Sequence, residues 1–328
     1  MAAWPVRFVT VIEKEKSATA GKGQFRAIVS ANTPLCREHY RLSLRLPAFP
    51  PTEPGQFVQI ACRDLDHRSD DSAPGVETIS ADWRATDPDL IAPTAVLRRP
   101  FSLAGRRDDA DGVTLEFIHR VVGLGTHWLE HLKVGDAVHI LGPLGNRFQL
   151  PRQDELAILV GGGVGIPPML YLATLLANHP AVALCGVTTR DLLPLTIVGD
   201  ASPHEPTPCI EEFARHKIPT LISTDDGSLG ARGFVTAALE KYLDSLPANT
   251  QAVIYTCGPE LMMKAVAAIA IKRRIPCQVA VERAMACGMG TCQSCVIRVK
   301  TPMRNAREWA YRLACTDGPV FAGADLLW

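Results

Sequence analysis

Three cysteines, Cys287, Cys292 and Cys295, stand within nine positions near the C-terminus, in the segment VERAMACGMGTCQSCVIRV. Their Cys-x4-Cys-x2-Cys spacing matches the plant-type ligand pattern of a [2Fe–2S] cluster, which needs a fourth cysteine further along the chain. Cys315, in YRLACTDGPVF, is the candidate for that fourth ligand. The glycines between the first three suit this chemistry, because a tight loop must turn its thiolates inward and bring backbone N–H groups to the cluster.

Structural zinc is the alternative for this cluster of cysteines, since a zinc site also takes four thiolates. Zinc motifs usually combine two Cys-x2–4-Cys pairs, whereas the fourth cysteine here stands alone. The spacing therefore favours iron and sulfur over zinc. The other cysteines are scattered, and most are expected to be small apolar core residues: Cys36, Cys62, Cys185, Cys209, Cys257 and Cys277.

Composition limits the kinds of protein that carry such a site. A chain of 328 residues predicts two or three domains, and 47% hydrophobic with 21% charged residues is typical of a globular protein. Lys plus Arg and Asp plus Glu both total 34, so no basic field exists to bind nucleic acid. The first 22 residues lack the pattern of a secretory signal, so we expect a cytoplasmic protein without a disulfide framework.

One uncharged stretch, residues 156–178, is long enough to span a bilayer. It contains four glycines and two prolines near its middle, which would leave backbone groups without hydrogen-bond partners in lipid. A buried strand, a loop and a helix explain the stretch better, so no membrane insertion is expected.

The first half of the chain, residues 1–152, reads as an antiparallel β-barrel domain. Short β-rich runs are separated by Gly and Pro without long helical patterns, which favours a closed barrel. An Asp-, Ser-, Ala- and Pro-rich stretch, about 63–98, is predicted to be a surface insertion. The runs are 25–34, 39–47, 55–62, 99–105, 112–123 and 136–145.

Residues 153–280 change to strands that alternate with helices, which predicts a doubly wound parallel sheet that binds a nucleotide. The predicted strands are 156–160, 182–189, 218–224 and 252–258, and the predicted helices are 167–178, 233–246 and 260–273. The remaining residues, 281–328, are too few for an independent apolar core. A segment of this size needs an additional stabilising link, such as a bound metal, to fold stably. These residues form the predicted [2Fe–2S] subdomain.

Two loops of the second domain have the character of phosphate- and nucleotide-binding turns. GGGVGIPPM (161–169) follows a buried strand and opens a helix, where a pyrophosphate could meet helix N–H groups, although it is not the G-x-G-x-x-G fingerprint. CGP (257–259) ends another buried strand before a helix. Since parallel strands end at one edge of the sheet, both loops and STDDGSLGARG (223–233) should line one crevice.

Two segments of the barrel domain could also hold a phosphorylated, ring-containing ligand. RRPFS (98–102) offers a guanidinium to a phosphate, an aromatic face and a hydroxyl. HRVVGLGTHWL (119–129) places Gly123, Gly125 and Thr126 before a short helical run, as in a phosphate-accepting turn. Each segment by itself is better explained by plain barrel structure.

Taken in order, these motifs resemble the ferredoxin–NAD(P) reductase superfamily, in which an antiparallel FAD barrel precedes a nicotinamide-nucleotide domain. RPFS resembles its flavin signature, GGGVGIPPM its glycine loop and CGP its second nicotinamide motif. Within that superfamily, TDDGSLGARGFVT, ERAMACGMGTCQSC and CTDGPVF are similar to the electron-transfer subunits of NAD-dependent (class 1B) dihydroorotate dehydrogenases. The resemblance covers most of residues 20–328.

The resemblance implies a role for each matching residue and no catalytic acid or base in this chain. It implies FAD contacts by Arg99, Pro100, Phe101, Ser102, Ile118, His119, Arg120, Gly125 and Thr126. It implies NAD contacts by Gly161, Gly162, Gly163, Gly165, Cys257, Gly258 and Pro259, and [2Fe–2S] ligation by Cys287, Cys292, Cys295 and Cys315. NAD is the family expectation, while Arg190 leaves a 2′-phosphate contact open.

The implied activity is electron transfer in pyrimidine (UMP) biosynthesis, from an FMN-containing catalytic subunit through [2Fe–2S] and FAD to NAD⁺, in a heterotetramer of two plus two subunits. The 63–98 insertion and the 19 residues between Cys295 and Cys315 depart from the family pattern. Two alternatives stay open: a flavin and iron–sulfur reductase that serves an oxygenase, hydrogenase or sulfite reductase, and a zinc-stapled, non-catalytic nucleotide sensor.

Overall fold

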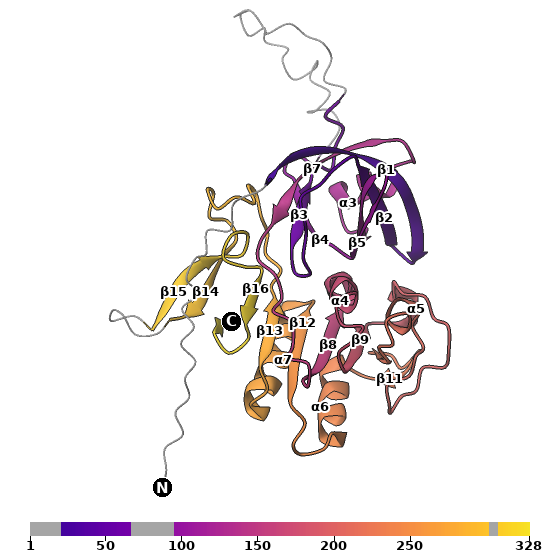
Figure 1. Ribbon diagram of the computed structural model, residues 1–328, viewed down its shortest axis with the longest axis vertical. Helices are drawn as coiled ribbons and strands as arrows, with labels where there is room; N and C mark the ends of the chain where they lie inside the picture. The colour runs from indigo at the N-terminus through magenta and orange to yellow at the C-terminus, as the bar shows by residue number, and fades with distance from the viewer. Residues whose placement is uncertain (1–20, 67–94, 302–307) are drawn as a thin grey trace, which may run out of the picture.

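The structure is a computed structural model that describes residues 21–66, 95–301 and 308–328 (Figure 1). Most of the predicted insertion, 67–94, lies outside the described residues, as does the N-terminal segment 1–20. Three parts follow one another along the described chain: a curled sheet, a parallel sheet with helices, and a small C-terminal sheet that touches both.

The first part is a curled antiparallel sheet of seven strands in the order β4-β3-β7-β1-β2-β6-β5. Its alternating burial follows the two-residue period of a strand with one face toward a core. The elements are β1 (Gly23–Cys36), β2 (His39–Leu46), β3 (Phe57–Ile60), β4 (Arg99–Ser102), β5 (Gly105–Asp109), β6 (Gly112–Arg120), α3 (Leu124–Glu130) and β7 (Ala137–Leu144).

The sheet curls into a barrel but is not closed by a ladder, which corrects the expectation of a closed barrel. Among the described strands, β4 and β5 form the two edges and do not pair with each other. The chain crosses the gap within two residues instead. The N–H of Leu103 donates to Gln56 O at 3.4 Å, and the N–H of Ala104 donates to Glu116 O at 2.8 Å. Strand β5, which the sequence did not predict, begins directly after this crossing.

The short helix α3 is held against the barrel by one half-buried amide. Asn32 Nδ2 on β1 donates to the carbonyl oxygens of Leu129, Glu130 and Leu132 at 2.8, 3.2 and 3.1 Å. The last carbonyls of a helix have no partner within the helix, so this side chain satisfies the C-terminal end of α3. The position of the turn before α3 is therefore set by the barrel.

The second part is a sheet in the order β11-β10-β9-β8-β12-β13-β16, parallel except for β16. Its inner strands β8 and β12 are buried on both faces, as expected for a doubly wound sheet. Its strands are β8 (Leu156–Gly162), β9 (Ala181–Val187), β10 (Thr220–Thr224), β11 (Ala231–Arg232), β12 (Ala252–Cys257), β13 (Cys277–Ala280) and β16 (Val320–Ala322). The helical elements are η1 (Gly163–Gly165), α4 (Ile166–Ala173), η2 (Arg190–Leu192), α5 (Glu211–Ala214), α6 (Val235–Ser245) and α7 (Glu260–Arg273).

The uncharged stretch 156–178 divides into β8, η1 and α4, as predicted from its glycines and prolines. Helix α4 ends at Ala173, earlier than the predicted 167–178. None of the helices in the described part of the chain is long and apolar enough to cross a membrane.

The C-terminal part has no core of its own, as its length predicted. Strands β14 (Val296–Lys300), β15 (Trp309–Leu313) and β17 (Leu326–Leu327) form a small sheet, while β16 joins the parallel sheet beside β13. Buried residues of β14 belong to the same apolar cluster as residues of β12, β13 and α7. The predicted division at residue 280 thus separates segments that share one core.

One side chain after β7 fastens the C-terminal part to the barrel. The amide of Asn146 donates to Asp317 O at 3.0 Å and Val320 O at 2.8 Å, and its oxygen accepts the N–H of Val320 at 2.9 Å. The neighbouring Gly145 has φ +77°, and a Cβ there would lie 2.5 Å from Pro319. These contacts hold the three parts in one arrangement.

Candidate cofactor sites and the pocket between them

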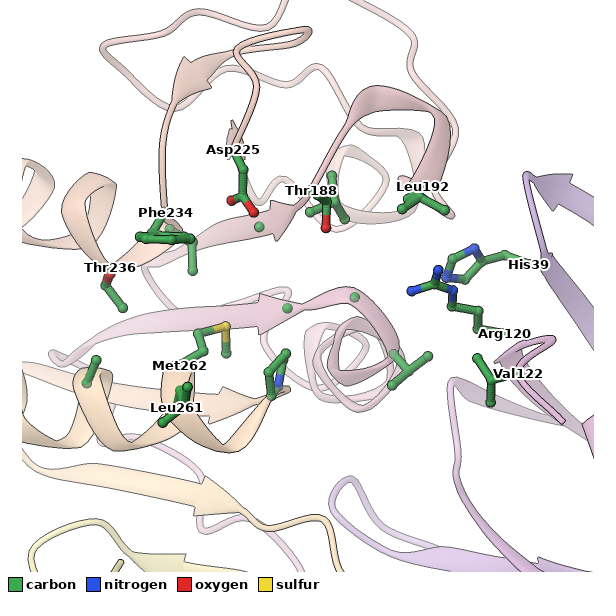
Figure 2. A pocket seen from close by; sticks show the side chains of 18 residues that line it. His39, Arg120, Val122, Thr188, Leu192, Asp225, Phe234, Thr236, Leu261 and Met262 are labelled. Atoms are coloured by element: carbon green, nitrogen blue, oxygen red, sulfur yellow. The ribbon is translucent and has the colours of Figure 1, made fainter.

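A pocket of about 630 Å³ lies where the carboxyl ends of β8, β9 and β10 face the barrel (Figure 2). In Figure 2, His39, Arg120 and Val122 enter from the barrel side, opposite Leu261 and Met262 of α7 and Phe234 and Thr236 at the start of α6. Glycines from two strand ends, together with Thr188, Leu192 and Asp225, complete much of the lining. The pocket therefore has apolar walls with few polar groups, as small-molecule sites usually do.

The two predicted nucleotide loops and the 223–233 loop do meet at this pocket. The pocket is lined by Gly162 and Gly163 of the first loop, Pro259 of the second loop and Asp225 of the 223–233 loop. The remaining predicted residues are not among its lining: Gly161, Gly165, Cys257, Gly258. They support the loops from behind, and burial raises the pKa of Cys257 well above its ordinary value, so this thiol stays neutral.

Glycine is required where these loops touch. A Cβ on Gly165 would lie 2.2 Å from the carbonyl group of Cys257, and a Cβ on Gly162 would lie 2.4 Å from Met262 Sδ. Gly163 differs, because it has φ +50° and nothing within 4 Å of its Cβ position. The loops thus form a cradle with open space above Gly163, which fits the close approach of a nucleotide phosphate.

The charges of the pocket are few. The guanidinium of Arg120 is held by Glu38, with Nε and Nη2 at 3.0 and 2.8 Å from Oε2. Within the described chain, the carboxylate of Asp225 has no hydrogen bond or ion pair, although it lines the pocket. Arg190, which could have met a 2′-phosphate, does not line the pocket; its N–H donates to Ser228 Oγ at 2.8 Å.

The predicted flavin motif, Arg99, Pro100, Phe101 and Ser102, is the edge strand β4. Its residues are partly exposed, and its second edge is unpaired among the described strands. An edge strand offers free backbone groups and side chains to a ligand that lies along it. The strand is therefore accessible to a ligand such as a flavin, and its flavin contacts stay a prediction.

The turn before α3 is built by the other predicted phosphate residues. Thr126 Oγ1 accepts the N–H groups of Val122 and Gly123 at 2.9 and 3.1 Å and donates to Gly123 O at 3.0 Å. Gly125 is buried, and a Cβ there would lie 3.1 Å from Cys62 Cβ. Thr126 thus shapes the turn from within.

The three predicted flavin residues of strand β6 lie in different environments. Ile118 is buried in the apolar cluster between the barrel and α4, and Arg120 lines the pocket. His119 is 2% exposed, stacks on Tyr40 with ring centroids 5.7 Å apart, and meets the edge of Phe101 at 6.3 Å.

Both ring nitrogens of His119 are buried without a hydrogen-bond partner in the described structure, and so is Nε of Arg98. Burial lowers the pKa of His119 to about 4, so the ring is neutral at pH 7. Buried polar atoms normally have partners. Orphaned atoms beside and directly before the flavin motif fit a polar cofactor bound there.

The four predicted cluster ligands come together although 19 residues separate the last two. Strands β14 and β15 pair as an antiparallel hairpin, with Val296 opposite Leu313. Cys295 precedes the hairpin and Cys315 follows it, and the N–H of Ala314 donates to Cys295 O at 3.1 Å. Residues 302–307, between these two strands, lie outside the described residues. The long spacer therefore returns the chain to the cluster.

The cysteine loop turns backbone donors toward one of its own sulfurs. The N–H groups of Met289 and Cys292 both donate to Cys287 Sγ at 3.4 Å. Hydrogen bonds to ligand sulfurs are typical of iron–sulfur sites and tune their potential. The loop therefore suits the predicted [2Fe–2S] cluster.

Two of the four predicted ligand thiols differ in how readily they lose a proton. Burial raises the pKa of Cys315 to about 12, so this thiol by itself would stay protonated. Hydrogen bonds with Ser294, whose Oγ lies 3.2 Å from Cys292 Sγ, lower the pKa of Cys292 to about 6. A coordinated metal deprotonates thiols outright, which fits a set of ligands that is partly buried.

The cysteine loop packs against the barrel strand next to the flavin motif. Gln59 Nε2 on β3 donates to Ala286 O at 3.3 Å. Gly288 has φ +69°, and a Cβ there would lie 2.8 Å from the Gln59 side chain. Gln59 is also the cross-strand partner of Pro100 in β4. One buried residue thus separates the cysteine loop from the predicted flavin strand.

Several residues of these sites were not named individually from the sequence. Asp225 lies in the 223–233 loop that was predicted to line the crevice, so its position after a buried strand was a usable signal. Tyr40, His39 and Gln59 had no such signal, because their roles depend on which strands become neighbours.

Comparisons with known proteins agree with this geometry. Residues 282–327 match the family model for the iron-sulfur cluster binding domain of dihydroorotate dehydrogenase B. The chain is 33% identical over 303 residues to the "Dihydroorotate dehydrogenase B (NAD(+)), electron transfer subunit" of Shouchella clausii, covering 92% of this chain and 96% of that protein. The protein of the same name from Caldanaerobacter subterraneus is 28% identical over 304 residues, 93% and 98% of the two chains.

Solved structures show the same fold. An NADH-dependent reduced ferredoxin-NADP oxidoreductase superposes with a TM-score of 0.67 at 25% identity, over 93% of this chain and 91% of that one. The ferredoxin-NADP⁺ reductase of Plasmodium falciparum superposes with a TM-score of 0.52 at 15% identity, over 79% and 96%, and shows the fold alone. The predicted combination of an antiparallel barrel, a doubly wound sheet and a C-terminal cluster region is thereby confirmed.

Replacing Cys292 with alanine should remove the iron centre without unfolding the protein, because this cysteine is exposed. We expect iron to fall from about two atoms per chain to near zero. The [2Fe–2S] EPR signal after dithionite reduction should disappear with it. Cys36→Ala, at the end of β1, is the matched control and should keep both. Wild-type iron content in Cys292→Ala would contradict the ligand assignment.

His119 should make the apoprotein acid-sensitive. The pKa of His119 is near 6.5 when the chain is unfolded and about 4 when it is folded. Between these two pH values the unfolded chain therefore binds a proton that the folded chain does not bind. The stabilising contribution is complete above pH 6.5 and is lost as the pH falls toward 4. His119→Phe should flatten this part of the curve of unfolding free energy against pH, measured by urea denaturation. An unchanged slope between pH 6.5 and 4 would refute the assignment.

Proposed function

The chain belongs to the family of electron-transfer subunits of NAD-dependent dihydroorotate dehydrogenase B, and on that premise we propose which residues perform the transfer. It is an oxidoreductase subunit that passes electrons from a catalytic subunit to NAD⁺. Its cofactors are FAD, a [2Fe–2S] cluster and NAD. The family places the reaction in pyrimidine biosynthesis.

The packing of the cysteine loop against β3 is the observation that carries the proposed route. When bound, the iron–sulfur centre exchanges single electrons, and FAD converts them into a hydride for NAD⁺. We assign Cys287, Cys292, Cys295 and Cys315 as the iron ligands. Gln59 holds the loop beside β4, so the proposed route from iron to flavin passes a buried side chain.

The barrel residues bind and orient FAD in this proposal. Arg99, Pro100, Phe101 and Ser102 present the edge strand to the flavin, supported by Ile118, His119 and Arg120. Gly125 and Thr126 form the turn at the start of α3 for its pyrophosphate. His119 stays neutral and offers hydrogen bonds from a ring that has no protein partner.

The pocket in Figure 2 is assigned to the nicotinamide nucleotide. Gly162, Gly163 and Pro259 contact it directly, while Gly161, Gly165, Cys257 and Gly258 keep the two loops in contact behind it. Phe234, 70% exposed at the start of α6, gives a face for a planar ring. The barrel end of the pocket, at Arg120, brings the nucleotide toward the flavin.

We further propose the assembly and the location of the protein. The partner is an FMN-containing catalytic subunit, and the complex contains two copies of each. The functional units are the FAD barrel at 1–152, the nucleotide unit at 153–280 and the cluster unit at 281–328. The free cysteines among the described residues support a cytoplasmic location, where thiols remain reduced.

Coexpression with a catalytic subunit tests the function. The purified complex should reduce NAD⁺ when dihydroorotate is added, followed by NADH absorbance. Cys292→Ala should abolish this reaction but retain reduction of ferricyanide by NADH, because that assay needs only the flavin and the nucleotide site. Dihydroorotate oxidation that yields no NADH in the wild-type complex would contradict the proposal, as would full NADH production by Cys292→Ala.

Asp225 should disfavour NADP⁺, because its unpaired carboxylate would repel a 2′-phosphate in the pocket. Asp225→Asn should raise kcat/KM for NADP⁺ relative to NAD⁺ by about tenfold, near 1.4 kcal/mol. Asp226→Asn is the matched control, since the Asp226 carboxylate is bound by Ser228 at 2.6 and 3.0 Å. If Asp225→Asn leaves the ratio of kcat/KM for NADP⁺ to kcat/KM for NAD⁺ unchanged, Asp225 does not discriminate between the two nucleotides.

A further inference from the structure

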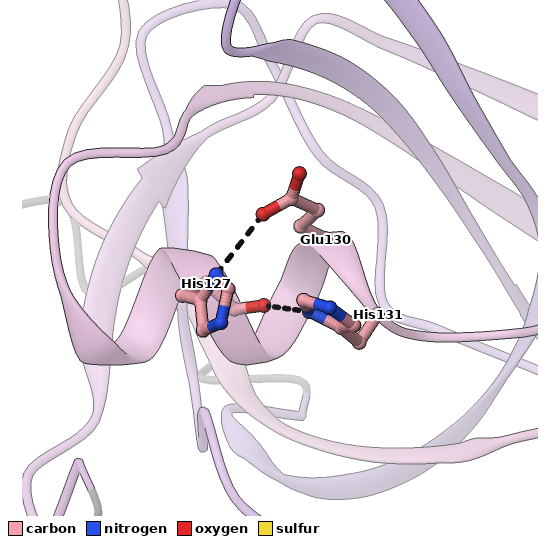
Figure 3. Close-up of side chains that lie close together, drawn as sticks. All are labelled: His127, Glu130 and His131. Carbon is pink, nitrogen blue, oxygen red and sulfur yellow. Dashed lines mark hydrogen bonds and ion pairs between the residues drawn. The ribbon is translucent and has the colours of Figure 1, made fainter.

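Three potential metal ligands lie on the last turn of α3 and directly after it. His127, Glu130 and His131 each offer one ligand atom, and these atoms all lie within 4.8 Å of one another (Figure 3). Residues three and four apart share one face of a helix, so the backbone itself brings the three side chains together. Among the described residues, this is the group of His, Cys, Asp and Glu side chains that meets this distance.

Hydrogen bonds fix the tautomer of His131 and the orientation of Glu130, two of the three potential ligands. His131 Nδ1 lies 2.8 Å from His127 O, so Nδ1–H donates to the carbonyl and Nε2 keeps its lone pair. Tyr40 OH donates to Glu130 Oε1 at 2.8 Å, which orients the carboxylate and leaves Oε2 toward His127. Such outer hydrogen bonds fix the tautomer and direction of metal ligands in proteins.

The spacing of the ligand atoms also suits a small cation. His127 Nδ1 and Glu130 Oε2 lie 3.1 Å apart in a hydrogen bond, which a bound metal ion would replace after Nδ1 loses its proton. This separation is near the edge of about 3.3 Å between ligands of a tetrahedral zinc. The side chain of His127 is 62% exposed and that of Glu130 is 28% exposed, so an ion can enter from solvent. Two imidazoles and one carboxylate select zinc, copper or nickel rather than magnesium or calcium.

We propose that His127, Glu130 and His131 form a binding site for a divalent transition metal such as Zn²⁺ or Cu²⁺. Three protein ligands leave a coordination position open for water. The site is on the barrel, and it uses none of the cysteines assigned to iron. It is also independent of the proposed electron transfer, so either assignment can fail without the other.

The position of the site links it to the flavin side of the barrel. Glu130 is hydrogen-bonded to Tyr40, and Tyr40 stacks on His119, which touches Phe101. The same helix carries Thr126, which shapes the predicted pyrophosphate turn. A metal ion that joins both ends of this last turn stabilises α3. The midpoint temperature of thermal unfolding should therefore rise as the metal concentration rises.

Copper EPR on the oxidised holoenzyme tests the site, because oxidised FAD and the oxidised [2Fe–2S] cluster give no EPR signal. One equivalent of Cu²⁺ should give a spectrum with hyperfine coupling to two imidazole nitrogens. His131→Gln should lose one coupling and weaken Cu²⁺ and Zn²⁺ binding at least about tenfold, measured by titration calorimetry. His204→Gln, which alters another exposed histidine, is the matched control and should behave like the wild type.

The variants must retain FAD absorbance, which shows that α3 and the barrel remain folded. If His131→Gln loses FAD, His127→Gln replaces it as the test, since His127 is the more exposed ligand on the helix surface. Wild-type coupling to two nitrogens in both variants would overturn the site. A wild-type spectrum with fewer than two coupled nitrogens would overturn it as well.

Discussion

The contact between the cysteine loop and strand β3 is the constraint on which the proposed electron route depends. Gly288 lacks a Cβ, so the loop can approach the side chain of Gln59, and the amide of Gln59 holds the loop by its Ala286 carbonyl. The same strand pairs with β4, which carries the predicted flavin motif. The proposed iron and flavin sites, from distant parts of the chain, therefore become neighbours through one strand.

That contact can persist because the C-terminal part is not a separate unit. Strand β16 completes the parallel sheet, and Cys295 and Cys315 belong to the apolar cluster beneath it. Asn146 ties the same segment to the end of the barrel by hydrogen bonds in both directions. A part too short for its own core thus takes its stability and its position from two neighbours.

The nucleotide pocket is also formed by two parts of the chain, the parallel sheet and the barrel. Parallel strands bring the glycine loops to one edge, where Gly165 permits backbone contact with Cys257. The barrel then contributes His39 and Arg120 to the opposite wall. Neither part encloses the pocket alone, so binding of a nucleotide there depends on the orientation of the two sheets.

The sequence by itself determined what is local or periodic. Cysteine spacing, glycine turns after buried strands and the change from two-residue to helical periods depend on neighbouring residues, so they were readable before folding. Only the tertiary structure decided which distant segments meet: Cys315 reached Cys295 through paired strands, and Gln59 and His39 gained their places from strand order. Barrel closure and strand β5 were misjudged for the same reason, because pairing between remote backbones depends on packing of the whole chain and leaves no pattern within a short window.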